Sequence, residues 1–392
     1  MVLISEASPF GLDNLPYGVF SVGGGPPRVG VRVGDSVVDL AAALGDEVFA
    51  APSLNPFMAT GPARWADARA RITGLVADDA VPDGAVHPLR DVELTLPFEV
   101  ADYVDFYASE AHASNLGRLF RPDNPEPLLP NWRHLPVGYH GRAGTVVVSG
   151  TGIVRPAGQR KGPADPAPVF GPSVRLDIEA ELGFVVGVGS PLGAPVTTAD
   201  FADRVFGVVL VNDWSARDLQ AWEYVPLGPH LGKSFATSVS AWVTPLAALA
   251  AARVPLPGQH PPVLPYLRED AEWGLDIDLA VEWNGEVVSR PPYASMYWSP
   301  AQMLAHLTVN GASTRTGDLF ASGTISGPAK DQRGAFIELT WGGAEPITVK
   351  GEARTFLADG DTVTITATAP GTAGRRIALG EVTGLIQPAR PA

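Results

Sequence analysis

The chain has 392 residues, of which 45 % are hydrophobic and 18 % are charged, so it is long enough for a large core and, we expect, two domains. Its net charge of −14 argues against nucleic acid as a partner, because phosphate contacts need clustered Lys and Arg. The absence of cysteine excludes disulfides, thiolate nucleophiles and Cys-ligated zinc or iron–sulfur clusters.

The chain also lacks the sequence features of an exported or membrane protein. Its first ten residues, MVLISEASPF, have neither the basic start nor the long apolar stretch of a signal peptide. The longest apolar runs, such as VFGVVLV, have the length of a β-strand and are too short to span a bilayer. We therefore expect a cytoplasmic protein with no membrane partner.

The pattern of residues 1–97 predicts a small N-terminal domain of mixed α and β structure. The stretch RVGVRVGDSVVDL predicts a hairpin that turns at Gly34 and Asp35. Residues 62–79 predict the clearest helix of the chain, because four apolar side chains recur at helical spacing: Trp65, Ala68, Ile72 and Val76. A stretch rich in Pro and turn residues follows, and we place the domain boundary at Pro97.

The pattern of residues 98–392 predicts a larger, β-rich domain. The chain contains 43 Gly and 38 Pro, which disfavour long helices and favour turns. Short apolar runs between these turns predict strands, among them TVVVSG, FVVGVG, VFGVVLV, LDIDLAVEWNG, FIELTWGG and DTVTITATA. We therefore expect a mainly β protein with some α structure, whose larger domain is a sandwich, barrel or roll.

In the stretch RLDIEAELGF, residues 175–184, an acid stands at every second position. Asp177, Glu179 and Glu181 share one face if this stretch is a strand, because alternate side chains point to the same side. Two carboxylates about 5 Å apart repel each other by roughly 1–3 kcal/mol at dielectric constants between those of water and a protein surface. Either this face is solvated, or a positive group offsets the repulsion.

The segment NDWSARDLQAWEY follows an apolar strand and has the pattern of a helix. Asp213, Arg217, Gln220 and Tyr224 recur at spacings that place them on one helical face. An acid, a base, an amide and a phenol on one face indicate the wall of a binding site. Two plainer interpretations stay open: Asp213 as a helix N-cap, and a surface salt bridge between Asp213 and Arg217.

The segment DYVDFYASEAHASNLGRLF places Asp105 and His112 on one face if the segment is helical. A functional His and a structural His are both consistent with this spacing. Asp105, Glu179, Glu181 and Asp213 together form an all-oxygen set that would suit Mg²⁺ or Ca²⁺. Zinc would be a poor fit, because its sites usually include His or Cys.

Two loops and one expected strand hold further candidates. GPHLGKS, residues 228–234, fails the spacing of a nucleotide-binding phosphate loop but leaves Lys233 as a cation for an anionic substrate. ASGTISGP, residues 321–328, is a run of small residues that forms either an anion-binding cup of backbone N–H groups or a tight turn. Glu338, in GAFIELTW, is expected on a strand face opposite its apolar neighbours.

Five blocks of the sequence closely resemble the fumarylacetoacetate hydrolase family: DNLPYGVFS, DYVDFYASEAHASNLG, LLPNWRHLPVGYHGRAGTVVVSG, NDWSARDLQAWEYVPLGPHLGKSFATS and ASGTISG. The resemblance implies an enzyme that hydrolyses a carbon–carbon bond of 4-fumarylacetoacetate to fumarate and acetoacetate, at the end of tyrosine and phenylalanine catabolism. It also implies a homodimer and two domains: a small SH3-like domain at residues 1–97 and a larger mixed β-roll or sandwich domain at residues 98–392.

The same resemblance assigns roles to residues at matching positions. The implied ligands of a Ca²⁺ or Mg²⁺ ion are Asp105, Glu179, Glu181 and Asp213, with Asp177 outside this set. His112 resembles the general base and Glu338 its partner, while the groups that stabilise the transition state are Arg217, Gln220 and Lys233. The implied substrate contacts are Tyr107, Arg121, Tyr139, Gln220, Tyr224 and Thr324. A second, structural Mg²⁺ site is implied at Lys233 and Thr237.

Two other functions are consistent with part of this pattern. Sibling enzymes, such as acylpyruvate hydrolases or metal-dependent decarboxylases of β-keto acids, share the carboxylates but usually lack the N-terminal domain and the LPVGYHGR block. A Ca²⁺-stabilised binding module would need only the carboxylates. That function would leave His112, Lys233 and the face formed by Arg217 and Gln220 without a purpose.

Overall fold

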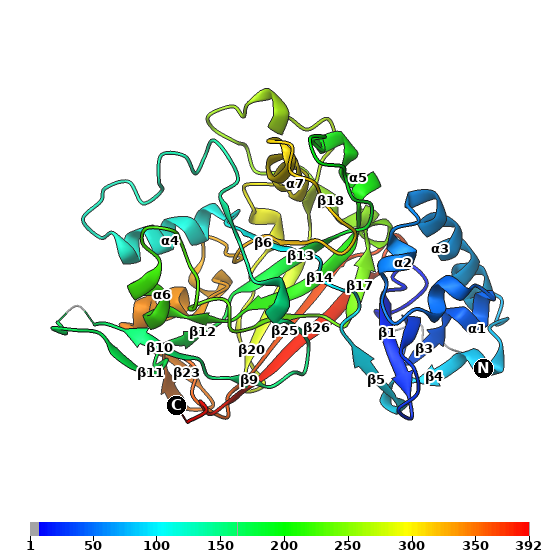
Figure 1. Cartoon of the computed structure of the whole chain (residues 1–392), viewed down its shortest axis with the longest axis horizontal. Helices are drawn as coiled ribbons and strands as arrows, with labels where there is room; N and C mark the ends of the chain where they lie inside the picture. The colour runs from blue at the N-terminus through cyan, green and yellow to red at the C-terminus, as the bar shows by residue number, and fades with distance from the viewer. Residues whose placement is uncertain (1–7, 163, 392) are drawn as a thin grey trace.

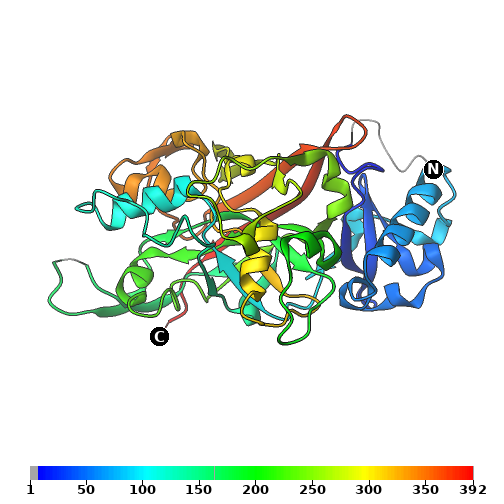
Figure 2. The same ribbon diagram turned by 90° about the horizontal axis from the view of Figure 1, so that it is seen from above.

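The computed structural model describes residues 8–162 and 164–391. Residues 1–7, which belong to the stretch without signal-peptide features, lie outside the described residues. As predicted, the chain is mainly β, with short helices around the sheets (Figure 1). The N-terminal unit lies at one end of the molecule in both views (Figures 1 and 2). Within the described ranges, no helix is long and apolar enough to cross a membrane.

The N-terminal unit is an antiparallel sheet of five strands with three helices beside it. Its elements are β1 (Tyr17–Val22), β2 (Arg28–Val33), β3 (Ser36–Asp39), β4 (Val86–Pro88), β5 (Val92–Thr95), α1 (Leu40–Leu44), α2 (Asn55–Met58) and α3 (Pro62–Ala77). The expected hairpin is confirmed, since Val33 of β2 stands opposite Ser36 of β3. The expected helix is confirmed as α3, which buries Ala68, Ile72 and Val76. The SH3-like fold and the boundary at residue 97 stay predictions.

The N-terminal sheet continues into the sheet that carries the acidic residues. β1 pairs with β17, and the strand order is β4-β3-β2-β1-β17-β14-β13-β22-β6-β7; off this path, β16 pairs with β14 and β8 pairs with β16. The added strands are β6 (Tyr103–Phe106), β7 (Gly138–His140), β8 (Val146–Val148), β13 (Ala180–Val186), β14 (Val205–Asp213), β16 (Thr237–Val239), β17 (Trp242–Pro245) and β22 (Leu319–Ala321). This order brings β6 close to β13 and β14, although they come from distant parts of the chain.

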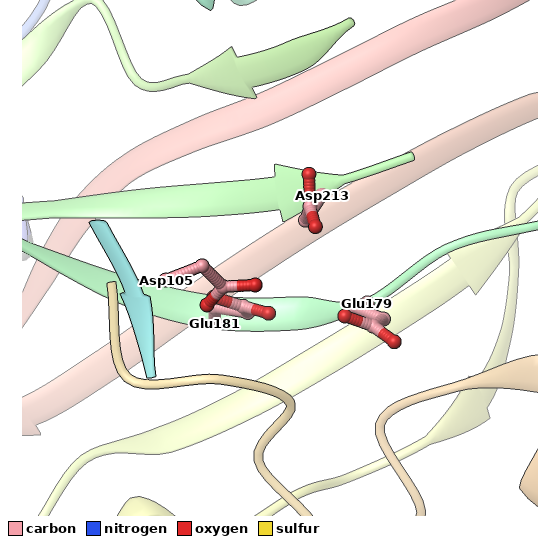
Figure 3. A group of neighbouring side chains, drawn as sticks. All are labelled: Asp105, Glu179, Glu181 and Asp213. Carbon is pink, nitrogen blue, oxygen red and sulfur yellow. The ribbon is translucent and has the colours of Figure 1, made fainter. Parts of the chain in front are cut away.

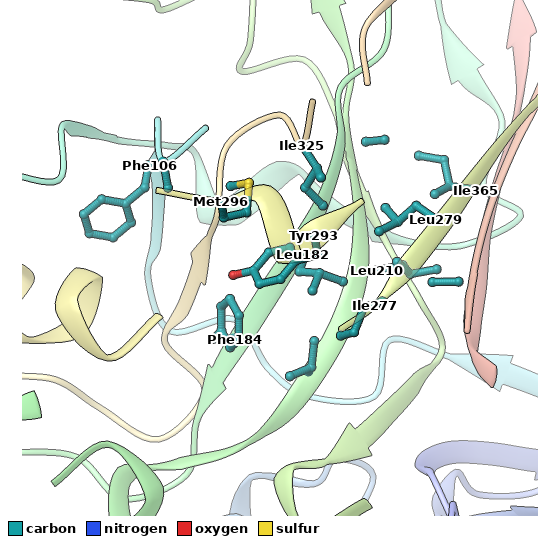
Figure 4. Packing of buried hydrophobic residues seen from close by; sticks show 14 of the residues in the cluster. Phe106, Leu182, Phe184, Leu210, Ile277, Leu279, Tyr293, Met296, Ile325 and Ile365 are labelled. Carbon is teal, nitrogen blue, oxygen red and sulfur yellow. The ribbon is translucent and has the colours of Figure 1, made fainter. Parts of the chain in front are cut away.

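A second sheet packs against the first and encloses the main core. Its order is β21-β20-β25-β26-β9, formed by β9 (Ile153–Val154), β20 (Asp278–Trp283), β21 (Glu286–Ser289), β25 (Thr362–Pro370) and β26 (Arg376–Gln387). The core between the sheets includes Leu182 and Phe184 of β13, Leu210 of β14 and Ile365 of β25 (Figure 4). Each fully buried side chain of this kind stabilises the fold by about 1.5–3 kcal/mol. Strands β13 and β14, which carry Glu181 and Asp213, are therefore anchored through their apolar face.

The remaining elements are short helices and two-stranded ribbons, connected in places by 3₁₀ turns. The helices are α4 (Glu110–Phe120), α5 (Phe201–Arg204), α6 (Arg217–Glu223), α7 (Pro300–Thr308) and α8 (Phe336–Leu339). The ribbons are β10 (Ala157–Arg160) with β11 (Val169–Pro172), β12 (Leu176–Asp177) with β15 (Ser215–Ala216), β18 (Arg253–Val254) with β19 (Gly274–Leu275), and β23 (Ile347–Val349) with β24 (Glu352–Arg354). Helices α4, α6 and α8 carry His112, Arg217 and Glu338, which belong to the site described below.

Two strand predictions are wrong in part. The stretch FIELTWGG is helical, because the backbone N–H groups of Phe336 and Ile337 donate to the side chain of Asp177 and so start helix α8. Glu338 therefore lies on a helix rather than on a strand. The acidic stretch is also not one continuous strand, since β12 ends at Asp177 and β13 begins at Ala180.

Two predictions of a shared helical face are also wrong. Asp213 is the last residue of β14, paired with Thr237 of β16, and helix α6 starts only at Arg217. Asp105 lies on β6, paired with neighbouring strands on both sides, and helix α4 follows it only after a break. In both segments the hydrogen bonds to adjacent strands override the helical spacing of the sequence.

Candidate active site

Four acidic side chains from neighbouring strands meet in the long sheet. Asp105 lies on β6, Glu181 on β13 and Asp213 at the end of β14, while Glu179 immediately precedes β13. One carboxylate oxygen of each lies within 4.8 Å of the others (Figure 3). All four residues are 5 % exposed or less, so this face is not solvated. The four residues predicted to bind a metal ion are thus brought together, and we refer to them as the carboxylate cluster.

Two members of the carboxylate cluster have oxygen atoms without a partner. Oδ1 of Asp105 and both carboxylate oxygens of Glu181 are buried and have no hydrogen-bond partner among the described residues. Burial raises the pKa of both carboxyl groups, and the charges of the neighbouring acids raise it further. An unpaired buried charge raises the free energy of the folded state, so a positive group bound to these oxygens would stabilise the site.

Lys233 offsets the charge of the other two members. Its Nζ lies 2.5 Å from Oε2 of Glu179 and 2.8 Å from Oδ2 of Asp213. Burial lowers the pKa of the Lys233 ammonium, but the two carboxylates raise it more. Burial raises the pKa of Glu179, but Lys233 and Arg217 lower it more, so Glu179 is ionised. Thr237 also donates to Asp213, at 2.8 Å, and the second Mg²⁺ site expected at Lys233 and Thr237 stays a prediction.

The carboxylate cluster fits a hard divalent cation. Its donors are carboxylate oxygens, which Ca²⁺ and Mg²⁺ prefer, and it contains neither His nor Cys for zinc. The partnerless oxygens of Asp105 and Glu181 are the groups that a bound ion would satisfy. The ammonium of Lys233 has only N–H donors, so in the carboxylate cluster this side-chain group offsets charge and is not a ligand of the ion.

Arg217 lies at the first position of helix α6 and joins the cluster to two further groups. Its Nη2 lies 2.8 Å from Oε1 of Glu179, and its Nε lies 2.8 Å from Oδ2 of Asp177. Its Nη1 donates to Oε1 of Gln220 at 3.2 Å. Burial lowers the pKa of Arg217, but the two carboxylates raise it more. The salt bridge considered between Asp213 and Arg217 is therefore replaced by pairs with Asp177 and Glu179.

His112 and Glu338, which are 226 residues apart in the sequence, form a buried pair. Nδ1 of His112 lies 2.6 Å from Oε2 of Glu338, and the two residues are 1 % and 0 % exposed. Asn115 donates to Oε1 of Glu338 at 2.9 Å, and Ser326 donates to Oε2 at 2.9 Å. Burial raises the pKa of Glu338, but His112 and these hydrogen bonds lower it more. An ionised Glu338 keeps the proton of His112 on Nδ1 and leaves Nε2 free to accept one.

The residues predicted to contact substrate differ in their burial. The ring of Tyr107 meets the ring of His112 edge to face, with centroids 5.2 Å apart. The hydroxyl of Tyr139 donates to Asp213 at 3.2 Å. Thr324 is buried in the loop after β22, and its hydroxyl has no hydrogen-bond partner within the part of the chain that the structure describes. Tyr107 and Tyr139 therefore contact the buried residues His112 and Asp213 directly.

Besides Gln220, described above with Arg217, two further predicted substrate contacts are more accessible. Arg121 is half-buried at the end of α4, and its Nη2 donates to the backbone carbonyl of Pro127 at 2.9 Å. Tyr224 directly follows α6 and is 43 % exposed. The polar residues predicted to bind substrate therefore extend from the buried carboxylate cluster to the protein surface.

Sequence patterns alone do not single out three polar residues of this site. Ser109 caps helix α4 by accepting the backbone N–H of His112 at 3.2 Å, and a Ser before a helix is a common capping signal. Asn115 lies three residues after His112 on the same helix, a spacing that could have indicated a shared face. Ser326 lies in the run of small residues 321–328, but nothing in that run indicates its contact with Glu338, to which only the fold brings it.

Comparisons with known proteins agree with this arrangement. Two family models match: Fumarylacetoacetase N-terminal over residues 13–97 and Fumarylacetoacetate (FAA) hydrolase C-terminal over residues 102–378. Fumarylacetoacetase from Homo sapiens is 45 % identical, covering 98 % of this chain and 98 % of the human protein. Fumarylacetoacetase from Arabidopsis thaliana is 42 % identical, covering 99 % of this chain and 98 % of the plant protein.

A solved structure matches the fold over nearly the whole chain. Fumarylacetoacetate hydrolase from psychrophilic Exiguobacterium antarcticum gives a TM-score of 0.60 at 16 % identity, covering 96 % of this chain and 100 % of that chain. At this identity the match shows a shared fold, while the two curated relatives show closer kinship in sequence. The chain therefore belongs to the fumarylacetoacetate hydrolase family, and it is a hydrolytic enzyme.

Proposed function

We propose that this enzyme hydrolyses a carbon–carbon bond of 4-fumarylacetoacetate to give fumarate and acetoacetate, the last step of tyrosine and phenylalanine catabolism. The names of the curated relatives support this substrate. The observation that carries the proposal is the buried pair of His112 and Glu338, 2.6 Å apart, together with the carboxylate cluster. A general base and a cation-binding group are what the addition of water to a ketone requires.

In this proposal His112 is the general base. Because Nδ1 donates to Glu338, Nε2 removes a proton from a water molecule, and the carboxylate stabilises the imidazolium that forms. The hydroxide produced adds to a ketone carbon of the substrate and gives a tetrahedral oxyanion. General-base catalysis of this kind contributes about 10²–10⁴-fold to the rate.

Arg217, Gln220 and Lys233 are proposed to stabilise the oxyanion. Oε1 of Gln220 accepts an N–H from Nη1 of Arg217 at 3.2 Å, and the amide N–H₂ group of Gln220 is proposed to donate to the substrate. Loss of one such donor typically costs about 2.7–4 kcal/mol of transition-state stabilisation. The bond between the hydrated carbon and the adjacent methylene carbon then breaks. Its electron pair leaves with the acetoacetate half as an enolate, which is protonated to acetoacetate.

The carboxylate cluster is proposed to hold a Ca²⁺ or Mg²⁺ ion through Asp105, Glu179, Glu181 and Asp213. When bound, this ion would supply Lewis-acid polarisation of a substrate carbonyl. The chain contributes carboxylate oxygens from these four residues, and two of the residues, Asp105 and Glu181, have oxygens without a hydrogen-bond partner in the described part of the chain. Lys233 offsets the negative charge of the other two, Glu179 and Asp213.

The substrate is proposed to bind to six polar residues: Tyr107, Arg121, Tyr139, Gln220, Tyr224 and Thr324. Arg121 offers a guanidinium group, which matches the carboxylates of fumarylacetoacetate in charge and shape. The hydroxyl of Thr324, buried without a partner in the described part of the chain, would gain one from the substrate. Tyr224, at the surface, would contact the end of the substrate nearest to solvent.

We further propose that the enzyme is a homodimer. Large apolar side chains are exposed near helix α6 and on or beside the β10–β11 ribbon, which packs against α6: Val169, Phe170, Val174, Trp222, Val225 and Leu227. Leu227 is 95 % exposed and Phe170 is 65 % exposed. Apolar side chains gathered at a surface indicate an interface, and a second copy of the chain would cover them. A monomer mass by light scattering at micromolar concentration would contradict this proposal.

An absorbance assay tests the proposed function. Addition of the metal-loaded enzyme should remove the absorbance of fumarylacetoacetate and release fumarate and acetoacetate in equal amounts, and His112→Ala should abolish most of this activity. An acylpyruvate serves as the comparison substrate. Turnover of the acylpyruvate without turnover of fumarylacetoacetate would show a sibling enzyme, and Ca²⁺ binding without turnover of either would support a binding module.

A further inference from the structure

Asp177 is a buried carboxylate outside the carboxylate cluster, and the mechanism above gives it no role. It ends strand β12 and is 0 % exposed. Its Oδ1 accepts the backbone N–H groups of Ile178 and Phe336, each at 2.8 Å. Its Oδ2 accepts the backbone N–H of Ile337 at 3.1 Å and Nε of Arg217 at 2.8 Å. Both oxygens are thus used twice, and every partner is a donor.

Two of these donors belong to the first turn of helix α8. The residue before this helix, Ala335, has no polar side chain with which to cap it, so Asp177 caps it from a distant part of the chain. Helix α8 carries Glu338, whose carboxylate binds His112. The position of Glu338 relative to His112 therefore depends on Asp177.

The side-chain donor to Asp177 is Arg217, at the start of helix α6. The side chains of this ion pair are 2 % and 0 % exposed, so solvent does not weaken it. Nη2 of the same guanidinium lies 2.8 Å from Oε1 of Glu179, in the carboxylate cluster. Without Asp177, Glu179 would be the one carboxylate among the described residues that is paired with Arg217.

We propose that Asp177 is a positioning residue that fixes Arg217 and Glu338 relative to each other. The inference rests on the proposed function, in which Arg217 stabilises the oxyanion and Glu338 orients the base. One carboxylate contacts both the guanidinium and the helix of Glu338, so a displacement on one side is transmitted to the other. Asp177 acts through these two residues and lies outside the metal-binding set.

The variant Asp177→Asn tests this role. In Asn, an N–H₂ group replaces one of the two carboxylate oxygens, and an N–H₂ group cannot accept the two hydrogen bonds that this oxygen received. Asn therefore keeps at most two of the four hydrogen bonds, and it also lacks the negative charge that pairs with Arg217. We expect kcat to fall by about 10- to 100-fold, less than the roughly 10²–10³-fold loss on removing an oxyanion donor itself. The KM for fumarylacetoacetate and the affinity for Ca²⁺, measured by calorimetry, should stay at the wild-type values.

Asp39→Asn is the matched control. Asp39 is also buried, caps helix α1 through the N–H of Ala42 at 3.1 Å and pairs with Arg28, but it belongs to the N-terminal unit. This variant should lower the melting temperature and leave kcat unchanged. If Asp177→Asn lowers kcat no more than Asp39→Asn does, Asp177 is only a helix cap and the inference is wrong.

If Asp177→Asn does not fold, Asp177→Glu decides the question. Glu keeps the buried charge, but its longer side chain shifts the carboxylate relative to Arg217 and to the first turn of helix α8. A folded Asp177→Glu enzyme with wild-type Ca²⁺ affinity and lowered kcat supports the positioning role, and a wild-type kcat overturns it. An inactive wild-type enzyme would instead overturn the proposed function, so the two failures are distinguishable.

Discussion

Glu338→Gln is the most informative perturbation of the site, because it keeps the shape of a buried side chain and removes its charge. The two oxygens of Glu338 bind His112 at 2.6 Å and accept donors from Asn115 and Ser326 at 2.9 Å each. A carboxamide must present its N–H₂ group to at least one of these partners. At least one hydrogen bond is therefore lost, and the imidazolium formed in the reaction loses its negative partner.

The expected size of the effect follows from these contacts. A hydrogen bond to a charged group contributes about 1.5–3 kcal/mol. Since each 1.36 kcal/mol of activation free energy is a factor of ten in rate, kcat should fall by about 10- to 160-fold. His112→Ala removes the base itself and should lower kcat by about 10²–10⁴-fold.

Steady-state hydrolysis of fumarylacetoacetate by both single variants and the double variant measures this prediction, with Ca²⁺ affinity as the control. Residues that act as one unit are strongly non-additive, so the double variant should be scarcely slower than His112→Ala. Two losses that multiply independently would refute the pairing of base and partner. A large loss of Ca²⁺ affinity in Glu338→Gln would show that Glu338 acts on the carboxylate cluster instead.

Three further predictions concern the carboxylate cluster. Chelation should abolish activity and lower the melting temperature, because the partnerless oxygens of Asp105 and Glu181 are left without an ion; full activity of enzyme shown to be metal-free by elemental analysis would contradict this. Glu181→Gln should weaken Ca²⁺ binding by more than about 100-fold, which is the upper range for losing a residue that only hydrogen-bonds to a metal ligand. Asp177→Asn should leave Ca²⁺ binding unchanged. Equal losses of Ca²⁺ affinity in calorimetry would show that Asp177 belongs to the metal-binding set or that Glu181 does not. The raised pKa values of Asp105 and Glu181 mean that the folded, metal-free protein binds more protons than the unfolded chain above about pH 4.5, so its stability should fall from about pH 5 to 7. Urea unfolding of the metal-free protein measures this slope, and a rise in stability over that range would be the wrong sign.

Structure that depends on near neighbours in the chain could be read from the sequence. The hairpin around Gly34 and the helix that buries Ile72 and Val76 both follow from local patterns. The alternation of acids predicted one strand face for Asp177, Glu179 and Glu181. Glu179 and Glu181 do meet in the carboxylate cluster, but Asp177 ends the separate strand β12 and pairs with Arg217. The resemblance of whole blocks then indicated which acids would meet.

Contacts between distant segments depended on the folded chain. His112 and Glu338 come from helices α4 and α8, and α8 is helical where a strand was expected, because the distant Asp177 caps it. Asp105 shares no helical face with His112, because hydrogen bonds to β22 and β7 hold it in a strand. Periodicity in a sequence reports which residues of one element share a face. Which elements meet is decided by strand pairing and by hydrogen bonds between segments far apart in the chain, and these leave no local pattern.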